Sequence, residues 1–354
     1  MIKDKSIFIR NIYWMLAYAF QTLKPDSYET IAKTEFDNIH NMFASILATG
    51  IGKQLKQGLY REYVEHREDM LTVRGKIDMP GTMQNHIAHK QQIACKYDIL
   101  SENNLLNQIV KTTSLLLLRH DGVDEEYKIT LKRELMFFSG VDAIELKTIR
   151  WTTIRFKKQN SAYRMIISIC QLIVEGMLMT TEQGEYRLAR FIDEQAMSRL
   201  YEKFILEFFK KECPEVKAGA TQIQWAVDGD RTYLPIMQTD IMLSKDDNIL
   251  IIDAKYYEEI MQSKHGSRTL NSSHLYQIYA YVKNKVAQHP KNTVKVTGML
   301  LYAKTDEPID LNEEYHMDGN VIRIKTLDLN RDFSEIAQQL KKIVEEQFFT
   351  KTSM

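Results

Sequence analysis

Two aspartates and one lysine are spaced so that their side chains would meet at the end of an apolar strand. Asp240 and Asp253 lie on either side of the polar stretch 244–248, which predicts a turn between two strands. If the turn consists of residues 246–247, the two aspartates face each other across the hairpin. Facing residues have Cβ atoms about 4.5–5.5 Å apart, so the carboxylates could share one small hard cation. Lys255 lies two residues beyond Asp253 and therefore projects from the same face.

This arrangement is suited to the Mg²⁺-dependent cleavage of phosphodiesters. Mg²⁺ prefers about one or two protein carboxylates and completes its shell with water and substrate phosphate. Asp240 and Asp253 supply that number, and the Ala254 carbonyl could add a ligand. Lys255 could orient or deprotonate the attacking water, or neutralise the developing charge. Mn²⁺ is the candidate substitute for Mg²⁺. The alternative interpretation is a salt bridge at a sheet edge.

Further polar side chains are candidates for the same site. Gln277 and Tyr281 are four residues apart on a predicted helix, where the Gln277 amide could hold Lys255 or a substrate phosphate. Glu202 flanks the apolar stripe of another predicted helix and could face the active site as a metal ligand. Glu207 lies on the opposite flank, so the pattern leaves open which glutamate contributes. Exposure to solvent is the alternative for all of these side chains.

Two basic segments are candidates for contact with the DNA backbone. The segment 258–273 is expected to form a polar loop beside the catalytic strand. The segment 147–164 interleaves basic and aromatic residues, a composition that suits phosphate contact. The candidate DNA-binding residues are Lys264, Arg268, Lys157 and Lys158. An ordinary surface loop, a solvated linker or a docking surface for an acidic partner are the alternatives.

The overall charge excludes one way of binding DNA. Lys plus Arg and Asp plus Glu are both 47, so no global positive field attracts nucleic acid, and a DNA-reading partner becomes plausible. No phosphate-binding glycine loop is present, which argues against hydrolysis of nucleotides by this chain. His86 and His89 lack the Cys or acidic neighbours that would complete a zinc site. The three cysteines fit a reducing compartment.

The length and the apolar pattern indicate two domains. The chain has 354 residues, of which 44% are hydrophobic and 27% charged, so it is globular. We expect a mixed α+β domain at 1–164 and a second domain at 165–354. The helices and strands of the second domain follow an order typical of an α/β mixed sheet flanked by helices.

The expected elements follow from apolar periodicity. Helices are expected at 11–23, 36–55, 101–119 with Ser101 as N-cap, 124–135, 165–179, 197–209, 273–286 and 333–349. Strands are expected at 60–64, 71–77, 220–227, 232–243, 248–255, 294–302 and 321–324. The run 165–179 is too short and too polar to span a membrane. Charges interrupt the N-terminus where a signal peptide would be apolar, so we expect a cytoplasmic protein without membrane contact.

Several short motifs follow one another along the chain. They are Ile9–Tyr18, Arg74–Asp78, Tyr97–Leu106, Leu200–Phe204, Thr239–Ile241, Asp253–Tyr257 and Leu275–Tyr279. In this order they resemble the McrC family, the nuclease subunits of McrBC 5-methylcytosine restriction systems. The resemblance runs nearly from end to end. One departure is Thr239, where the family has proline; this position shapes the backbone and donates no chemistry.

The resemblance implies a PD-(D/E)xK nuclease fold in the C-terminal half. It assigns Asp240, Asp253 and Lys255 to catalysis, with Gln277 and Glu202 as auxiliaries. It also implies a partner, a McrB-like hexameric AAA+ GTPase that the N-terminal part docks on and stimulates. Recognition of modified cytosine in double-stranded DNA belongs to that partner. We expect some of the GTPase-stimulating residues in the extended region 58–83, where exposed strands could project into a ring.

The function that we expect is that of a Mg²⁺-dependent endodeoxyribonuclease subunit of a modification-dependent restriction complex. One alternative is a non-catalytic adaptor that activates the GTPase and whose acidic residues are structural. The other is a stand-alone nuclease for DNA repair, which would cut without GTP or a partner.

Overall fold

The computed structural model describes residues 6–19, 34, 36–180, 186–188, 192–256, 261–264, 267–289, 294–304 and 309–350. The chain divides into two units. Met1–Phe43 and Glu175–Met354 form the first, called the sheet unit, and Ala44–Val174 form the second, called the helical unit. Among the described residues, no helix combines the length and hydropathy that a membrane crossing needs.

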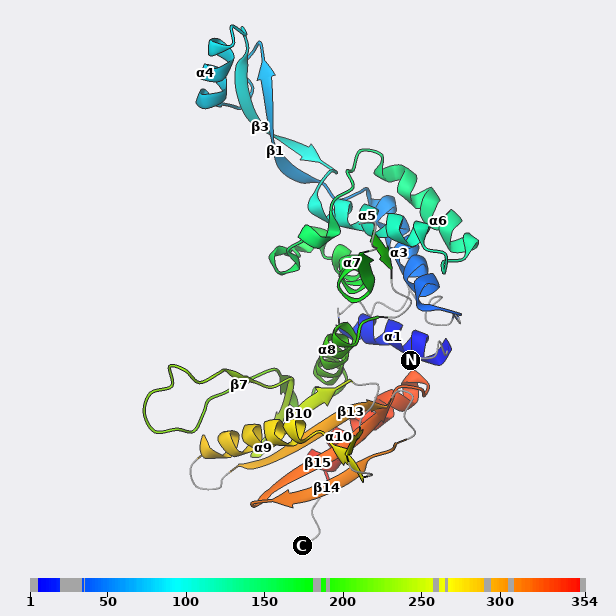
Figure 1. Cartoon of the computed structure of the whole chain (residues 1–354), viewed down its shortest axis with the longest axis vertical. Helices are drawn as coiled ribbons and strands as arrows, with labels where there is room; N and C mark the ends of the chain where they lie inside the picture. Colours follow the sequence, from blue (N-terminus) through cyan, green and yellow to red (C-terminus); the bar gives the residue numbers. More distant parts are fainter. Residues whose placement is uncertain are drawn as a thin grey trace. The chain divides into compact units, whose positions relative to one another are not determined.

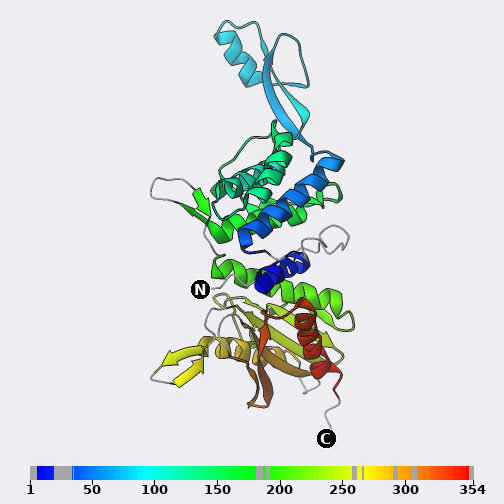
Figure 2. The same ribbon diagram turned by 90° about the vertical axis from the view of Figure 1, so that its right-hand side faces the viewer.

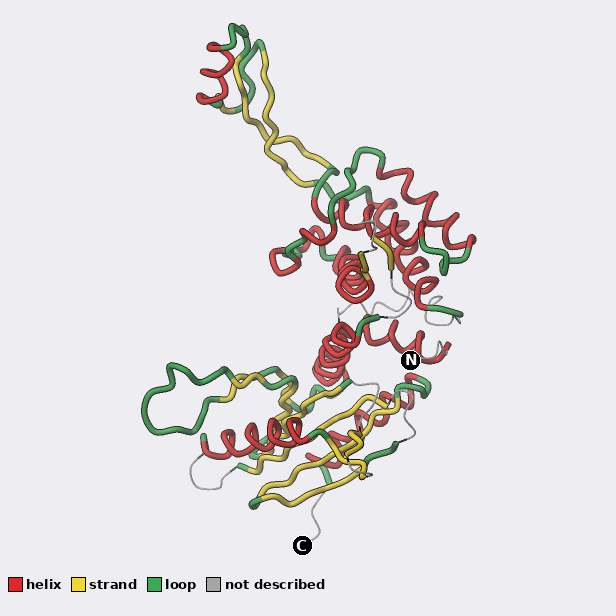
Figure 3. Tube along the Cα trace, viewed as in Figure 1, coloured by secondary structure: helices red, strands yellow, loops and turns green. Residues whose placement is uncertain are grey.

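The sheet unit is built on a six-stranded mixed sheet with the order β14–β15–β13–β10–β9–β6 (Figures 1 and 3). These strands are β6 Lys217–Gly219, β9 Ile241–Lys245, β10 Asn248–Lys255, β13 Lys295–Lys304, β14 Asn312–Met317 and β15 Asn320–Asp328. β10, β13 and β15 run parallel, and the remaining neighbours pair antiparallel. The expected mixed α/β sheet is confirmed, and β10 is buried from Ile249 to Ala254.

Three helices of the sheet unit pack on this sheet. They are α8 Glu194–Glu212, α9 Ser272–Ala287 and α10 Phe333–Phe348. α9 and α10 lie on opposite sides of the sheet (Figure 2), and α8 packs against β10. Asp193 and Asn271 cap α8 and α9 by accepting hydrogen bonds from backbone N–H groups of the first turn. The expected helices at 197–209, 273–286 and 333–349 are therefore present.

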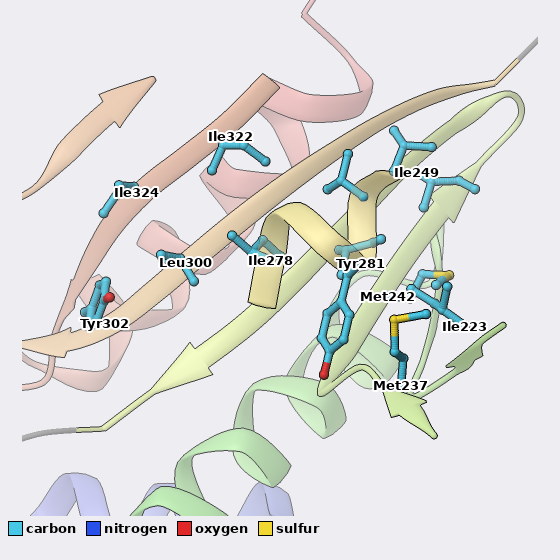
Figure 4. Close-up of a cluster of buried hydrophobic side chains, with 13 residues drawn as sticks. Ile223, Met237, Met242, Ile249, Ile278, Tyr281, Leu300, Tyr302, Ile322 and Ile324 are labelled. Atoms are coloured by element: carbon cyan, nitrogen blue, oxygen red, sulfur yellow. The ribbon is translucent and has the colours of Figure 1, made fainter. Parts of the chain in front are cut away.

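One hydrophobic core fills the space between α9 and the sheet (Figure 4). Ile278 and Val282 of α9 meet Leu300 of β13 and Ile322 of β15, all with less than 1% of their surface exposed. Gly298 allows this close approach. A Cβ atom there would lie 2.8 Å from side-chain atoms of Ile278, Val282 and Ile322. Any larger residue at this position would push α9 away from the sheet.

The first helix, α1 Ser6–Ala19, belongs to the sheet unit. The Trp14 ring stacks on the Phe333 ring of α10, with centroids 4.8 Å apart. The Asn11 Nδ2 atom donates hydrogen bonds of 2.8 Å to the carbonyls of Leu329 and Arg331. The structural division therefore differs from a simple boundary at 164/165, because residues before 44 pack with elements some 320 positions later.

The helical unit contains several α-helices and one extension that is built from β-strands. The helices are α3 Ile39–Gln57, which begins at the boundary between the units, α5 Leu105–Arg119, α6 Glu125–Leu135 and α7 Tyr163–Met177, which ends just beyond the unit. Short 3₁₀ turns cover η2 Met136–Phe138, η3 Leu146–Thr148, η4 Trp151–Thr153 and η5 Lys158–Asn160. The expected Ser101 cap is wrong: Ser101 ends a strand, and the Asn104 side chain caps α5 by accepting from the Asn107 N–H.

A two-stranded ribbon extends from these helices and carries a small lobe (Figure 1). β1 Glu62–Met70 pairs antiparallel with β3 Ile93–Ser101, and β2 Lys76–Ile77 joins β3 beside α4 Met79–Ile87. We call residues 71–92 the tip lobe. Its exposed apolar residues are Leu71, Val73, Ile77, Met79, Met83 and Ile87. β3 was absent from the sequence-based expectation, and β1 is longer than expected.

Smaller strand pairs complete the described chain. They are β4 Leu178–Thr180 with β5 Tyr186–Leu188, β7 Gln222–Ile223 with β8 Met237–Gln238, and β11 Met261–Lys264 with β12 Ser267–Leu270. The expected strands 220–227 and 232–243 are thus shorter, because most of the intervening chain is irregular.

Candidate active site

The hairpin of β9 and β10 has the register that the sequence predicts. Asn248 pairs with Lys245 and Ile252 pairs with Ile241, so the turn consists of Asp246 and Asp247. Asp246 takes the left-handed φ of 49°, which aspartate tolerates better than most residues. The ladder ends one pair before Asp240 and Asp253, which places these two residues at the end of the hairpin.

The two aspartates occupy neighbouring positions there. The backbone N–H of Ala254 donates a 2.9 Å hydrogen bond to Oδ2 of Asp240. Asp253 is 1% exposed, and its Oδ2 lies 2.9 Å from Nζ of Lys255. Lys255 is thus a positive neighbour of this carboxylate, and within the described chain neither Asp253 carboxylate oxygen accepts a hydrogen bond from a backbone N–H. Such a carboxylate is costly to bury unless another positive ligand completes it.

A chain of hydrogen bonds connects Lys255 to α9. Lys255 Nζ donates to Oε1 of Gln277 at 3.1 Å, and Gln277 Nε2 donates to the Tyr281 hydroxyl at 3.0 Å. The Tyr281 hydroxyl donates in turn to the Gln238 carbonyl at 3.0 Å. Figure 4 shows the Tyr281 side chain extending away from α9. Gln277 therefore lies where the sequence places it, and Tyr281 fixes which end of its amide faces the ammonium.

The charges of Asp240 and Lys255 also affect the pKa of Glu202 in α8. Burial and the negative charge of Asp240 raise its pKa, while the hydroxyl of Ser198, which donates to Oε1 at 3.1 Å, lowers it. Lys255 also contributes to lowering this pKa. Glu207, in contrast, forms a 2.7 Å ion pair with Lys210 of the same helix. The geometry thus favours Glu202 over Glu207 as the additional acid.

Burial dominates the electrostatics of the aspartate pair. It raises the pKa of Asp253 to about 7, with a further rise from the charge of Asp240 and an opposing effect of Lys255. Burial also raises the pKa of Asp240, against the ammonium of Lys255 and the N–H of Ala254. Strongly perturbed acids at one edge of a sheet are typical of functional sites. Nearby, burial and Lys255 lower the pKa of His274 to about 4.

The residues fit a divalent oxygen-binding cation such as Mg²⁺. Asp240 and Asp253 provide the two carboxylates that Mg²⁺ prefers. The buried Asp253 oxygens have lone pairs that could coordinate the cation. Asp240 uses Oδ2 for the Ala254 N–H and keeps Oδ1 as a candidate ligand. The described residues contain no group of three or more His, Cys, Asp or Glu arranged for a metal. A two-carboxylate site does not need such a group.

The candidate DNA-binding residues are divided between the two units. Lys264 and Arg268 lie on the β11–β12 hairpin, so the expectation of an irregular loop at 258–273 is wrong. His265, also noted in that segment, lies outside the described residues. Lys157 and Lys158 are exposed at η5 in the helical unit. Their role in DNA binding stays a prediction.

Sequence reasoning noted Tyr281 without giving it a role, and it missed a histidine–tyrosine pair. Nδ1 of buried His274 lies 2.9 Å from the hydroxyl of Tyr302, which is directly opposite Lys255 in the β10–β13 register. The spacing of Gln277 and Tyr281 was a usable signal, since residues four apart share a helix face. No comparable pattern joins His274 to Tyr302, because their proximity depends on the packing of α9 against β13.

Comparison with known proteins identifies the family of this chain. A family described as McrBC 5-methylcytosine restriction system component matches residues 5–303. The type IV methyl-directed restriction enzyme EcoKMcrBC of Escherichia coli (strain K12) is 27% identical over 344 residues, covering 96% of this chain and 97% of that protein. A chain in a solved complex of Thermococcus gammatolerans McrB AAA+ hexamers with bound McrC has the same fold, with TM-score 0.53, 18% identity, and coverage of 96% and 75%. The resemblance found in the motifs is confirmed: this chain belongs to the McrBC 5-methylcytosine restriction system component family.

Proposed function

We propose that this chain is the Mg²⁺-dependent endodeoxyribonuclease subunit of a modification-dependent restriction complex, with a PD-(D/E)xK active site. One observation carries the proposal. Asp240 and Asp253 meet at the end of a hairpin beside Lys255, and the buried Asp253 oxygens accept no hydrogen bond from a backbone N–H among the described residues. A buried carboxylate with a purely structural role would be expected to be satisfied by such donors.

Each residue has a distinct task in this proposal. Asp240 and Asp253, with the Ala254 carbonyl and Glu202 as further candidates, would hold the cation. A bound Mg²⁺ supplies charge stabilisation at the phosphate and lowers the pKa of attacking water. Lys255, held between Asp253 and Gln277 at 2.9 and 3.1 Å, would present its ammonium to the scissile phosphate. Gln277 restrains that ammonium and thereby reduces the reorganisation needed for catalysis.

The proposed partner is a McrB-like hexameric AAA+ GTPase. Support comes from family membership and from the Thermococcus gammatolerans complex, whose description names McrB AAA+ hexamers with bound McrC. The tip lobe offers a suitable docking element, because Leu71 and Ile87 are each 77% exposed and the lobe stands on a thin ribbon. In this proposal the partner recognises modified cytosine in double-stranded DNA. Lys264, Arg268, Lys157 and Lys158 of this chain would contact the backbone.

The decisive experiment is single-turnover cleavage of modified DNA by the complete complex with GTP and Mg²⁺. Asp253→Ala and Lys255→Ala should each lower the rate by roughly 100-fold or more, while partner binding stays intact. Asp247→Asn, in the exposed turn of the same hairpin, is the matched control and should cut normally. Normal cutting by either active-site variant refutes the nuclease assignment.

A metal titration separates the nuclease from a non-catalytic adaptor. Mg²⁺ or Mn²⁺ should raise the melting temperature of the isolated chain, and Asp240→Ala should remove this effect. Unchanged metal stabilisation in Asp240→Ala would place the ion elsewhere. Cleavage by the chain alone, without GTP and partner, would instead identify a stand-alone repair nuclease.

A further inference from the structure

The ribbon of the helical unit has no packed layer to fix its direction. β1 and β3 are each 9 residues long, which corresponds to about 25–30 Å. All residues of β1 except Met70 are exposed, so no core supports this strand along its length. A two-stranded ribbon without a packed face is marginally stable by itself. The direction in which it leaves the helices must therefore be determined at its base.

The base contains a buried network of asparagine and tyrosine side chains. Asn107, 0% exposed, donates through Nδ2 to the carbonyls of Tyr60 at 2.9 Å and Glu102 at 2.7 Å. Asn104 Nδ2 also donates to the Tyr60 carbonyl, at 2.8 Å. These carbonyls lie just before β1 and just after β3. The network thus holds both strands of the ribbon at the point where they meet α5.

Tyr163 of α7 completes the network from a second helix. Its hydroxyl donates to Oδ1 of Asn107 at 2.7 Å and accepts from the backbone N–H of Tyr60 at 3.1 Å. The Asn107 amide nitrogen therefore donates to carbonyls at the two strand ends, and its amide oxygen accepts a hydrogen bond from Tyr163 of α7. Outside the network, the Arg61 guanidinium pairs with the Glu102 carboxylate at 2.7 Å. Buried networks whose polar groups are satisfied hold one geometry, because any displacement leaves a donor or acceptor unpaired.

We propose that Asn107 and Tyr163 are positioning residues that fix the direction of the ribbon and so present the tip lobe to the AAA+ partner in one orientation. This inference rests on the proposed GTPase-stimulating function. The residues lie at the opposite end of the ribbon from the tip lobe, so they act through the orientation of the lobe and not through contact. A lobe on a loosened base still reaches the partner, but it spends less time in the stimulating orientation.

The test measures GTP hydrolysis by the McrB-like partner as a function of the concentration of the full chain. Tyr163→Phe removes one hydroxyl and Asn107→Ala removes the strand-end donors. Each should lower maximal stimulation by about fivefold or more. The concentration giving half-maximal stimulation should change less, by about threefold at most, because the surface of the tip lobe is unaltered. Leu117→Ala, a core substitution in α5 outside the network, is the stability-matched control and should keep full maximal stimulation at temperatures where all proteins are folded.

Each outcome decides the matter. Normal stimulation by both folded variants overturns the positioning role and leaves the proposed function standing. An equal loss in Leu117→Ala also overturns it, because general destabilisation would then explain the result. Failure of the unaltered chain to stimulate the partner would instead refute the proposed function. If Asn107→Ala does not fold, Tyr163→Phe alone decides.

Discussion

Oδ2 of Asp240 accepts a hydrogen bond from the backbone N–H of Ala254, the residue between Asp253 and Lys255. This bond ties the end of β9 to the centre of the Asp-Ala-Lys segment, beyond the last ladder pair, Ile252 with Ile241. Both acids are therefore held by backbone geometry and need no flexible loop to meet. Preorganisation of this kind is what electrostatic catalysis requires.

Tyr281→Phe should slow cleavage without weakening DNA binding. Removing the hydroxyl frees the Gln277 amide to rotate and turn its NH₂ group towards the Lys255 ammonium, which is unfavourable. We expect a loss of roughly threefold to tenfold in the single-turnover rate, about the effect of one hydrogen bond. Tyr279→Phe is the control, because that hydroxyl pairs with exposed Asp318 at 3.3 Å. Equal rates for Tyr281→Phe and the unaltered chain would remove Tyr281 from the active site.

The Asp253 carboxyl should make the metal-free protein less stable as pH rises. Its pKa is raised from 3.8 to about 7 in the folded state, so the folded chain binds the proton more tightly than the unfolded chain. The contribution of this group to the free energy of unfolding is then lost as the pH rises from about 4 to 7. His274, with a pKa lowered to about 4, acts in the opposite direction up to about pH 6.5.

Asp253→Asn removes the titration of Asp253 together with its interaction with Asp240, while His274 is common to both proteins. In EDTA, the variant should gain stability relative to the unaltered chain as pH rises from about 4 to 7, and the difference should then level off. Urea denaturation at a series of pH values measures this difference in stability. A difference that stays constant with pH would show that Asp253 ionises normally.

Gly298→Ala should destabilise the sheet unit by about 1–3 kcal/mol. The new methyl group would lie 2.8 Å from Ile278, Val282 and Ile322, and α9 would have to move away from the sheet. Gly219→Ala in edge strand β6 is the control, since nothing lies within 4 Å of its added Cβ. Chemical denaturation compares the two, and equal stabilities would contradict the tight packing between α9 and β13.

Leu16→Ala should weaken the sheet unit, although it lies far in sequence from the catalytic residues. Leu16 of α1 is 0% exposed, and a cavity there should cost about 2–5 kcal/mol. Hydrogen exchange should therefore speed up in α8 and α10 and stay unchanged in α5. The matched substitution Leu117→Ala in α5 should give the reverse pattern. Faster exchange confined to the helical unit in Leu16→Ala would contradict the placement of α1.

The sequence predicts the register of the β9–β10 hairpin well because the information for it is local. The polar residues 244–248 determine the turn, and the turn determines which residues face each other. Gln277 is predictable for a related reason, since it lies early in a helix that follows the catalytic strand. These contacts depend on short connections and on the regular periods of strands and helices.

Other features depend on contacts that no local pattern encodes. β3 escapes prediction because its partner β1 is almost wholly exposed and its own consecutive buried residues, Ala94 and Cys95, lack the alternation of a half-buried strand. β14, likewise exposed at five of its six positions, is missed for the same reason. The position of α1 requires knowing that Trp14 stacks on Phe333. The network of Asn107 and Tyr163 joins side chains 56 residues apart.

The packing of α1 against α10 sets an order for events during synthesis. Trp14 leaves the ribosome long before Phe333 exists, so the stacking of these two rings has to wait for almost the whole polypeptide. The intervening residues 44–174 can collapse meanwhile, because they form a unit of their own. The stacking of Trp14 on Phe333 can thus form only after the helical unit has been synthesised and translation has passed residue 333.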